Sequence, residues 1–276
     1  MWDDNSVLSN SPIRKQKSLD VAIVGAGVAG NYIAWRLLNE QPSLNIAVIE
    51  QSARIGGRLY SEHVNGVKTV AIEHGGMRFS RNHKLLTSLV DHLGLPTRPF
   101  KSVLADANPI YIRNHHTSLK QLASGDRPPY SIPAELGTTD PGQIIPASVI
   151  TFLQNQAITP SPACDLIHCL DKADFKGKSF NELSFKEFLN HVCDPEVFNY
   201  YNDIHGYWVD THDNVSAREL LLGFLPFVSD SDTITISAGM QSLPIKLAEL
   251  AAQSGCQYFM RSRLTGISRS SDRFEL

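Results

Sequence analysis

Short apolar runs alternate with a glycine-rich turn over the first fifty residues, in the pattern of a parallel α/β unit. An apolar run at residues 20–24 ends in Gly25-Ala26-Gly27-Val28-Ala29-Gly30, and residues 31–39 then carry apolar side chains at helical spacing. A second apolar run follows at residues 45–50. Strand, glycine turn, helix and strand predict a right-handed βαβ unit whose parallel sheet is covered on both faces.

After about residue 80 the pattern predicts mostly helices joined by loops. Helices are expected at residues 85–93, 147–156, 184–192, 215–227 and 242–252. We also expect a hairpin at 102–118 with its clearest strand at Ile110–Arg113, a loop at 124–146, and strands at 263–267 and 274–276. The predicted fold is therefore α/β, a Rossmann-like domain interrupted by a mostly helical (α+β) domain.

The same pattern predicts the limits of the domains. Residues 1–17 are polar and acidic, and we expect a disordered leader there. Residues 18–80 are expected to form the first segment of the dinucleotide domain, 81–232 the inserted substrate domain, and 233–276 the second dinucleotide segment. The last predicted strand has no partner after it, which suggests a fragment or one product of a split gene.

Composition narrows the classes of partner. The 276 residues carry a formal net charge of −3, so we expect no nucleic-acid partner, and no apolar run approaches the length of a transmembrane segment. The sequence has four cysteines, Cys164, Cys169, Cys193 and Cys256, with no zinc-binding spacing and no CxxC pair. This pattern favours reduced thiols in a cytoplasmic protein.

Two histidine-containing segments could suggest a metal site, but we predict none. Neighbouring residues on a strand point to opposite faces, so the pair His115-His116 is a poor chelate and is expected in a polar turn. The polar-aromatic cluster around His205, Trp208 and His212 lacks a helix-spaced histidine pair, and a helix-capping loop is favoured.

The glycine turn carries the strongest prediction of chemistry. In a βαβ unit Gly25 allows the tight turn, Gly27 lets a pyrophosphate approach, and Gly30 lets the helix pack on the sheet. The helix N-terminus, with Val28 and Ala29, would offer N–H groups to the phosphates. Glu50, with the adjoining Gln51, is placed for the ribose of adenosine, and its charge argues against a 2′-phosphate. A turn of this kind that binds no ligand is the alternative.

A second glycine segment, Arg54-Ile55-Gly56-Gly57-Arg58, follows Glu50 closely. The combination resembles the flavoprotein superfamily of monoamine oxidases, L-amino acid oxidases and phytoene desaturases. The resemblance implies FAD as the cofactor, with Gly57 passing close to it and Arg58 at the pyrophosphate. The alternative for Arg58 is a surface arginine after a turn.

A third segment narrows the resemblance to the L-amino acid oxidases. Glu73-His74-Gly75-Gly76-Met77-Arg78-Phe79 is similar to their Gly-(Gly/Pro)-Met-Arg segment. The resemblance implies that Gly75, Gly76 and Met77 line the flavin and that Arg78 holds the substrate carboxylate, for which a guanidinium is well shaped. An internal salt bridge of Arg78 is the alternative.

The resemblance returns near the C-terminus and weakens in the helical middle. Residues 237–244 look like the family's Gly-Met-x-x-Leu-Pro stretch, and by the same match the Leu264 backbone would meet the adenine ring. Two departures stand out. His74 takes the place of an aliphatic residue, and the family's next strand-turn-helix segment is missing, so the C-terminal part of the family fold is expected to be absent. A complementary chain or a homo-oligomer could complete the site.

These features predict an FAD-dependent oxidase that converts L-amino acids to keto acids, ammonia and hydrogen peroxide, with no catalytic residue assigned. Two alternatives stay open. One is an amine or polyamine oxidase or a desaturase of the same fold, whose substrate would leave Arg78 without a ligand. The other is a binding protein without flavin, as in the similar Rab GDP-dissociation inhibitors, or an inactive fragment.

Overall fold

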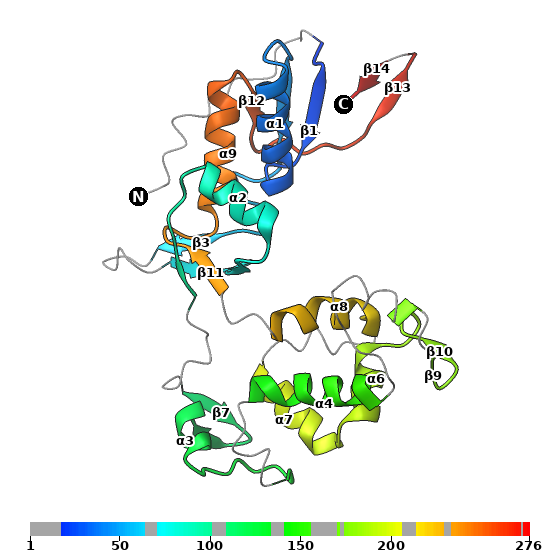
Figure 1. Ribbon diagram of the computed structural model, residues 1–276. Helices are drawn as coiled ribbons and strands as arrows, with labels where there is room; N and C mark the ends of the chain where they lie inside the picture. Colours follow the sequence, from blue (N-terminus) through cyan, green and yellow to red (C-terminus); the bar gives the residue numbers. More distant parts are fainter. Residues whose placement is uncertain are drawn as a thin grey trace. The chain divides into compact units, whose positions relative to one another are not determined.

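The computed structural model describes residues 18–63, 71–100, 109–133, 141–155, 170–171, 174–205, 214–228, 233–271 and 273–276. The chain divides into two compact units (Figure 1). The first comprises Met1–Phe100 and Asp232–Leu276, and the second comprises Lys101–Ser231. Residues 81–100 thus belong to the same unit as the glycine turn, whereas the assignment of functions to the two units stays a prediction.

A three-stranded parallel sheet organises the first unit. The strands β1 (Val21–Val24), β2 (Ile46–Ile49) and β12 (Gln257–Phe259) lie in the order β1-β2-β12. Helix α1 (Val28–Glu40) connects the first two, which confirms the predicted parallel βαβ unit. The expectation that both faces are covered is wrong at the end of β1, where the side chain of Val24 is 57% exposed. This strand also lies at the edge of the described sheet.

Helices α1 and α9 (Ser242–Gln253) pack side by side over one face of this sheet (Figure 1). Their shared core consists of apolar side chains from both helices and from all three strands: Ile23, Ala34, Trp35, Leu38, Ile46, Val48, Leu243, Leu247, Ala251 and Tyr258. Burial of apolar area of this kind is the main force that joins the C-terminal segment to the N-terminal one.

A second, antiparallel sheet completes the first unit. It has the order β5 (Phe79–Ser80), β11 (Thr233–Ile236), β6 (Thr97–Pro99), and α2 (Lys84–His92) connects β5 to β6 along the chain. A short hairpin of β3 (Ser61–His63) and β4 (Ala71–Glu73) precedes it. The hairpin of β13 (Ser268–Ser270) and β14 (Arg273–Glu275) ends the chain.

The second unit is mostly helical, as predicted for the inserted segment. Its helices are α3 (Leu119–Ala123), α4 (Pro141–Asn155), α6 (Phe185–Val192), α7 (Pro195–His205) and α8 (Ala217–Val228). Its strands form two hairpins, β7 (Ile110–Ile112) with β8 (His115–Thr117), and β9 (Asp174–Phe175) with β10 (Lys178–Ser179).

Aromatic side chains fill the larger core of the second unit. Phe180, Phe185 and Phe188 are buried, and the ring of Phe188 lies 5.6 Å from that of Phe180 and 6.3 Å from that of Phe185, between centroids. A capping box of Ser184 and Glu187 starts α6, so the serine at the predicted boundary is the N-cap.

Several local predictions are wrong. Residues 263–267 form no strand. The expected last strand does form, as β14, and it pairs with the preceding β13. Helix α4 begins at Pro141, inside the expected loop, since proline is tolerated in a first helical turn. His115 and His116 lie on strand β8 rather than in a turn. The pattern also missed β11, β12 and α7, three elements whose apolar residues meet partners far away in the sequence.

Some predictions lie outside the described residues, among them the leader 1–17, Cys164, Cys169, Trp208 and His212. Among the described residues no helix is long and apolar enough to cross a membrane. Within the same residues no cluster of three metal-ligating side chains occurs.

Candidate functional site

Two of the three turn glycines are required by the fold itself. Gly25 has a φ of +99°, which side-chain-bearing residues rarely adopt. A Cβ on Gly30 would lie 2.0 Å from the Gly25 carbonyl oxygen. Helix α1 can therefore approach the end of β1 only if residue 30 has no side chain, which is the packing role predicted for it.

Gly27 differs from its neighbours because its surroundings are open. A Cβ built there would meet no atom closer than the Cα of Gly57, at 4.0 Å. Gly27 is also the N-cap of α1, no side chain caps this helix end, and its first turn contains no acid. Val28 is half-buried and Ala29 is exposed. An uncapped helix N-terminus beside a bare glycine is suited to receive a phosphate.

Glu50 lies at the end of β2 and is anchored by backbone groups. Its carboxylate accepts hydrogen bonds from the Ala26 N–H at 2.8 Å and from the Ser52 N–H at 2.7 Å. Burial by itself raises the pKa of Glu50, but these hydrogen bonds and the charge of Arg54 outweigh it, so the pKa is lowered. The carboxylate is thus charged at neutral pH, and each oxygen keeps a lone pair for a further donor. Gln51 beside it is exposed.

The second glycine segment lies directly against the first. The Gly56 N–H donates to the Ala26 carbonyl oxygen at 3.0 Å, and a Cβ on Gly57 would lie 3.3 Å from the Cα of Gly27. Gly56 and Gly57 have φ values of +135° and +58°. Glycines on both sides therefore let two backbone segments meet at the helix N-terminus. The predicted approach of Gly57 to the cofactor stays a prediction.

The two arginines of this segment have different environments. Arg54 donates to the carbonyl oxygens of Gly57 at 2.7 Å and Leu59 at 3.2 Å, and it lies over the ring of Tyr60. Arg58 is exposed and has no hydrogen-bond or ion-pair partner among the described residues. Arg54 thus holds the loop together, and Arg58 remains available for an anion.

The third segment packs against the second through its backbone. The Gly76 N–H donates to the Arg58 carbonyl oxygen at 3.3 Å, and the His74 N–H donates to that of Tyr60 at 2.8 Å. A Cβ on Gly75 would lie 1.8 Å from the Arg58 carbonyl oxygen, so this glycine is required for the contact. The three glycine segments are therefore joined in one backbone assembly within the first unit.

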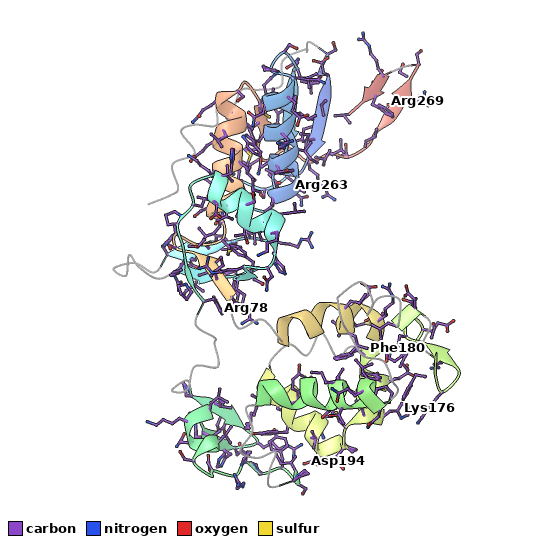
Figure 2. All side chains as sticks on the ribbon, in the orientation of Figure 1. Arg78, Lys176, Phe180, Asp194, Arg263 and Arg269 are labelled. Carbon is purple, nitrogen blue, oxygen red and sulfur yellow. The ribbon has the colours of Figure 1, made fainter. Side chains whose placement is uncertain are left out.

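Arg78 follows Met77, and both are half-buried. The guanidinium of Arg78 lies 5.3 Å from the centre of the Phe100 ring, and among the described residues it has no carboxylate partner. The alternative of an internal salt bridge finds no support in these residues. Figure 2 shows Arg78 at the end of the first unit that carries β11.

His74 contacts Glu62 and Tyr60 and does not lie in the core. Its Nε2 lies 2.8 Å from the Glu62 carboxylate, and its ring stacks on that of Tyr60. The side chain is 46% exposed. We therefore assign His74 a place at the surface of the hairpin that contains β3 and β4.

Leu264 lies in a segment without regular structure that is nonetheless attached to the Glu50 end of β2. The Ser262 N–H donates to the Glu50 carbonyl oxygen at 2.8 Å, and the Arg261 N–H donates to that of Ser52 at 3.0 Å. Leu264, two residues later, is half-buried. Its contact with an adenine ring stays a prediction.

Sequence reasoning missed Glu73 as a structural centre of the site. Its carboxylate accepts hydrogen bonds from the Met240 N–H at 2.8 Å and the Ser61 hydroxyl at 2.7 Å. The Gln241 side chain in turn donates to the Ile55 carbonyl oxygen at 2.7 Å. An acid shortly before a glycine pair was the available signal, but its partner Met240 lies 167 residues away in the sequence.

Sequence comparison places this assembly in a known family. The chain matches the family of flavin containing amine oxidoreductases over residues 28–276. The chain belongs to that family. This membership confirms the resemblance inferred from the glycine segments and, with it, the flavin cofactor FAD. The bare Gly27, the uncapped helix end and the unpartnered Arg58 fit a flavin dinucleotide.

Individual relatives differ in their names and in the extent of the match. The chain is 27% identical to achacin from Lissachatina fulica over 266 residues, which is 93% of the chain and 48% of achacin. It is 27% identical to an L-amino-acid oxidase of Neurospora crassa over 125 residues, 40% of the chain and 18% of that protein. It is 37% identical to a putrescine oxidase of Kocuria rosea over 97 residues, 35% of the chain and 18% of that protein.

A solved structure shares the fold. A triple mutant of putrescine oxidase superimposes with a TM-score of 0.58 and 22% identity, covering 93% of this chain and 53% of that one. The chain thus spans about half the length of the curated relatives that it matches most extensively, 48% in the case of achacin.

Proposed function

We propose that the protein is an FAD-dependent oxidase of L-amino acids, which releases a keto acid, ammonia and hydrogen peroxide. The observation that carries the proposal is Arg78. It is a half-buried arginine directly after the Gly75-Gly76-Met77 segment, and it has no carboxylate partner among the described residues. A guanidinium in this position is suited to bind the carboxylate of an amino acid in a bidentate manner.

The other residues take the roles that the turn pattern and the family resemblance imply, and their geometry is compatible with these roles. We assign the pyrophosphate to Gly27, the N-terminal turn of α1 and Arg58, and the adenosine ribose to Glu50 with Gln51. The backbone of Gly75–Met77 would line the flavin, and Leu264 the adenine. When bound, FAD supplies the two-electron acceptor. Arg78 would hold the α-carbon in place, so the protein contributes orientation and needs no strong base if the amine binds neutral.

The first test is an absorption spectrum of the purified chain with FAD, followed by anaerobic addition of L-amino acids. Retained flavin that bleaches supports the proposal. A stable protein that ignores FAD would contradict it and favour a binding protein without flavin, and poor solubility without flavin would favour an incomplete half.

The second test separates amino acids from amines. Arg78→Ala should raise KM for L-amino acids about 10- to 150-fold, the equivalent of roughly 1.5–3 kcal/mol for a hydrogen bond to a charged group. Arg78→Lys should restore only part of this loss, because lysine lacks the planar fork. Arg98→Ala, an exposed arginine on β6, is the matched control. Equal losses for amino acids and amines would rule out the carboxylate assignment.

An amine or polyamine oxidase is the second candidate, and the match to a putrescine oxidase at 37% identity over 97 residues supports it. Its substrate has no carboxylate, so Arg78→Ala would leave KM unchanged. Oxidation of diamines but not of amino acids by the wild-type protein would favour this candidate.

We also propose that β1 offers its free edge to a complementary chain. Among the described residues β1 pairs only with β2, and Val24 is 57% exposed. An unpaired strand edge is a template for another strand. Light scattering of the purified chain tests this: a complex with a co-expressed partner supports it, whereas a homo-oligomer would show that a second copy occupies the edge. The cytoplasmic location stays a prediction from the cysteines.

A further inference from the structure

Ala26, the residue between the first two turn glycines, is held through both of its backbone polar groups. Its N–H donates to Glu50, and its carbonyl oxygen accepts from the Gly56 N–H at 3.0 Å and from the Asn31 side-chain amide at 2.9 Å. Ala26 and Asn31 are both fully buried, at 0% exposure. Because glycines flank Ala26 on each side, these hydrogen bonds restrict a turn that would otherwise have wide conformational freedom.

The Asn31 side chain is itself oriented by a residue of the C-terminal segment. Its Oδ1 accepts a hydrogen bond from the Tyr258 hydroxyl at 2.8 Å, across a separation of 227 residues. Burial raises the pKa of Tyr258, and the nearby Cys256 thiol adds to this, so the hydroxyl stays protonated and can donate. A continuous chain of hydrogen bonds therefore runs from β12 through α1 to the carbonyl of the turn.

Packing alone does not explain why position 31 carries an asparagine. An amide inside a helix has lower helix propensity than leucine, and burying it is unfavourable unless its hydrogen bonds are satisfied. Asn31 satisfies both ends of its amide, one with the turn and one with Tyr258. An apolar side chain of the same size would fill the space without holding the turn.

We propose that Asn31 and Tyr258 are positioning residues of the dinucleotide site. They hold the Ala26 carbonyl and thereby aim Gly27 and the first N–H groups of α1 at the pyrophosphate, without touching the cofactor. The inference rests on the proposed FAD site. It also makes β12 a part of that site, although the strand lies at the far end of the chain from the glycine turn.

Two variants isolate the chain of hydrogen bonds. Asn31→Leu removes both contacts with little change in volume, and Tyr258→Phe removes only the hydroxyl. Two controls match them. Leu247→Ala loosens the same core from α9, where Leu247 is 0% exposed, and Tyr32→Phe changes an exposed tyrosine on α1.

Hydrogen exchange of the 276-residue chain without FAD is the first measurement, because it needs no cofactor. Amides of residues 25–31 and 54–58 should exchange about tenfold faster in Asn31→Leu and in Tyr258→Phe, while those of α9 stay as in the wild type. Leu247→Ala should instead accelerate exchange throughout the first unit. Unchanged exchange at 25–31 in both variants would overturn the inference, whether or not the chain binds FAD.

Titration with FAD, followed by flavin fluorescence, is the second measurement. We expect Kd to rise about tenfold in Tyr258→Phe and at least as much in Asn31→Leu, the size of effect typical of one lost buried hydrogen bond. The double variant should lose no more than Asn31→Leu alone, since both act through the same amide. Losses that add, or that Leu247→Ala reproduces at equal Tm, would overturn the positioning role. A wild-type chain that takes up no FAD would refute the proposed function. Hydrogen exchange alone would then test whether Asn31 and Tyr258 hold the turn in position.

Discussion

The two units of this chain use polar side chains in opposite ways. Of the five buried polar or charged residues in the described parts of the chain, four lie in the first unit, at Asn31, Glu50, Ser80 and Thr235, and the fifth is Thr117 of the second. In the first unit the buried Asn31 and Glu50 tie backbone turns together.

In the second unit a prominent ion pair lies near the surface. Arg113 pairs with Glu196 at 2.8 Å and lies over Tyr130, while a separate cluster of phenylalanines, leucines and other apolar residues forms the larger core. The difference indicates that buried polar groups fix the conformation of a backbone turn in the first unit, in addition to its apolar core, whereas the second unit is stabilised mainly by apolar packing.

The largest expected effect on stability distinguishes two glycines of the same turn, Gly30 and Gly27. Gly30→Ala should destabilise the first unit by at least about 3 kcal/mol, because its Cβ would lie 2.0 Å from the Gly25 carbonyl oxygen. Gly27→Ala should cost no more than about 1 kcal/mol, the usual difference between glycine and alanine at an N-cap. It should nevertheless abolish FAD binding, since the new methyl group would occupy the open space beside the helix N-terminus.

Thermal unfolding measures the stability of the two variants, and titration with FAD measures their affinity for the cofactor. A Gly27→Ala protein that folds and still binds FAD with wild-type affinity would show that the pyrophosphate does not lie at Gly27. A Gly30→Ala protein as stable as the wild type would contradict the packing role.

A substitution in the second unit should lower stability by a similar amount but leave FAD binding unchanged. Phe188 is fully buried among other phenylalanines, and Phe188→Ala should destabilise the second unit by about 3–5 kcal/mol. Hydrogen exchange should show the loss in α6 and α8, with FAD affinity unchanged. A parallel loss of protection in α1 and of FAD affinity would break the comparison, because it would mean that the two units unfold together.

The smallest expected effects on stability come from replacing either of two carboxylates, Glu50 or Glu196, by an amide. Glu50→Gln should cost about 1–3 kcal/mol at neutral pH, because one of the backbone N–H groups of Ala26 and Ser52 loses its acceptor. Since the folded pKa of Glu50 lies below its ordinary 4.5, its contribution is complete above pH 4.5 and is lost as the pH falls through the folded value. The difference from the wild type should therefore shrink in acid.

Glu196→Gln is the control for an exposed carboxylate. Arg113 and Asn199 lower the pKa of Glu196 to about 2 through hydrogen bonds, yet the pair is exposed to solvent. We expect no measurable change in urea unfolding at high salt. A larger loss for Glu196→Gln than for Glu50→Gln would reverse the comparison between the units.

The sequence predicted the parts of the fold that depend on local pattern. The βαβ unit, the helix at 184–192 and the helical character of the second unit follow from periodicity and turn residues, which act over a few residues. The strands β11 and β12 were missed because each is short and becomes a strand only by pairing with a distant one.

The sequence by itself predicted which segments would meet a dinucleotide, since glycine spacing and the acid Glu50 report directly on backbone geometry. Only the tertiary structure decided how two nearby arginines differ, because Arg54 donates to carbonyl groups of its own folded loop and Arg58 has no such partner among the residues that the structure describes. It alone also revealed the contacts of Asn31 with Tyr258 and of Glu73 with Met240. The physical reason is that a hydrogen bond between residues far apart in the chain leaves no periodic trace in the sequence, and it forms only when packing of α1 against α9 brings the segments together.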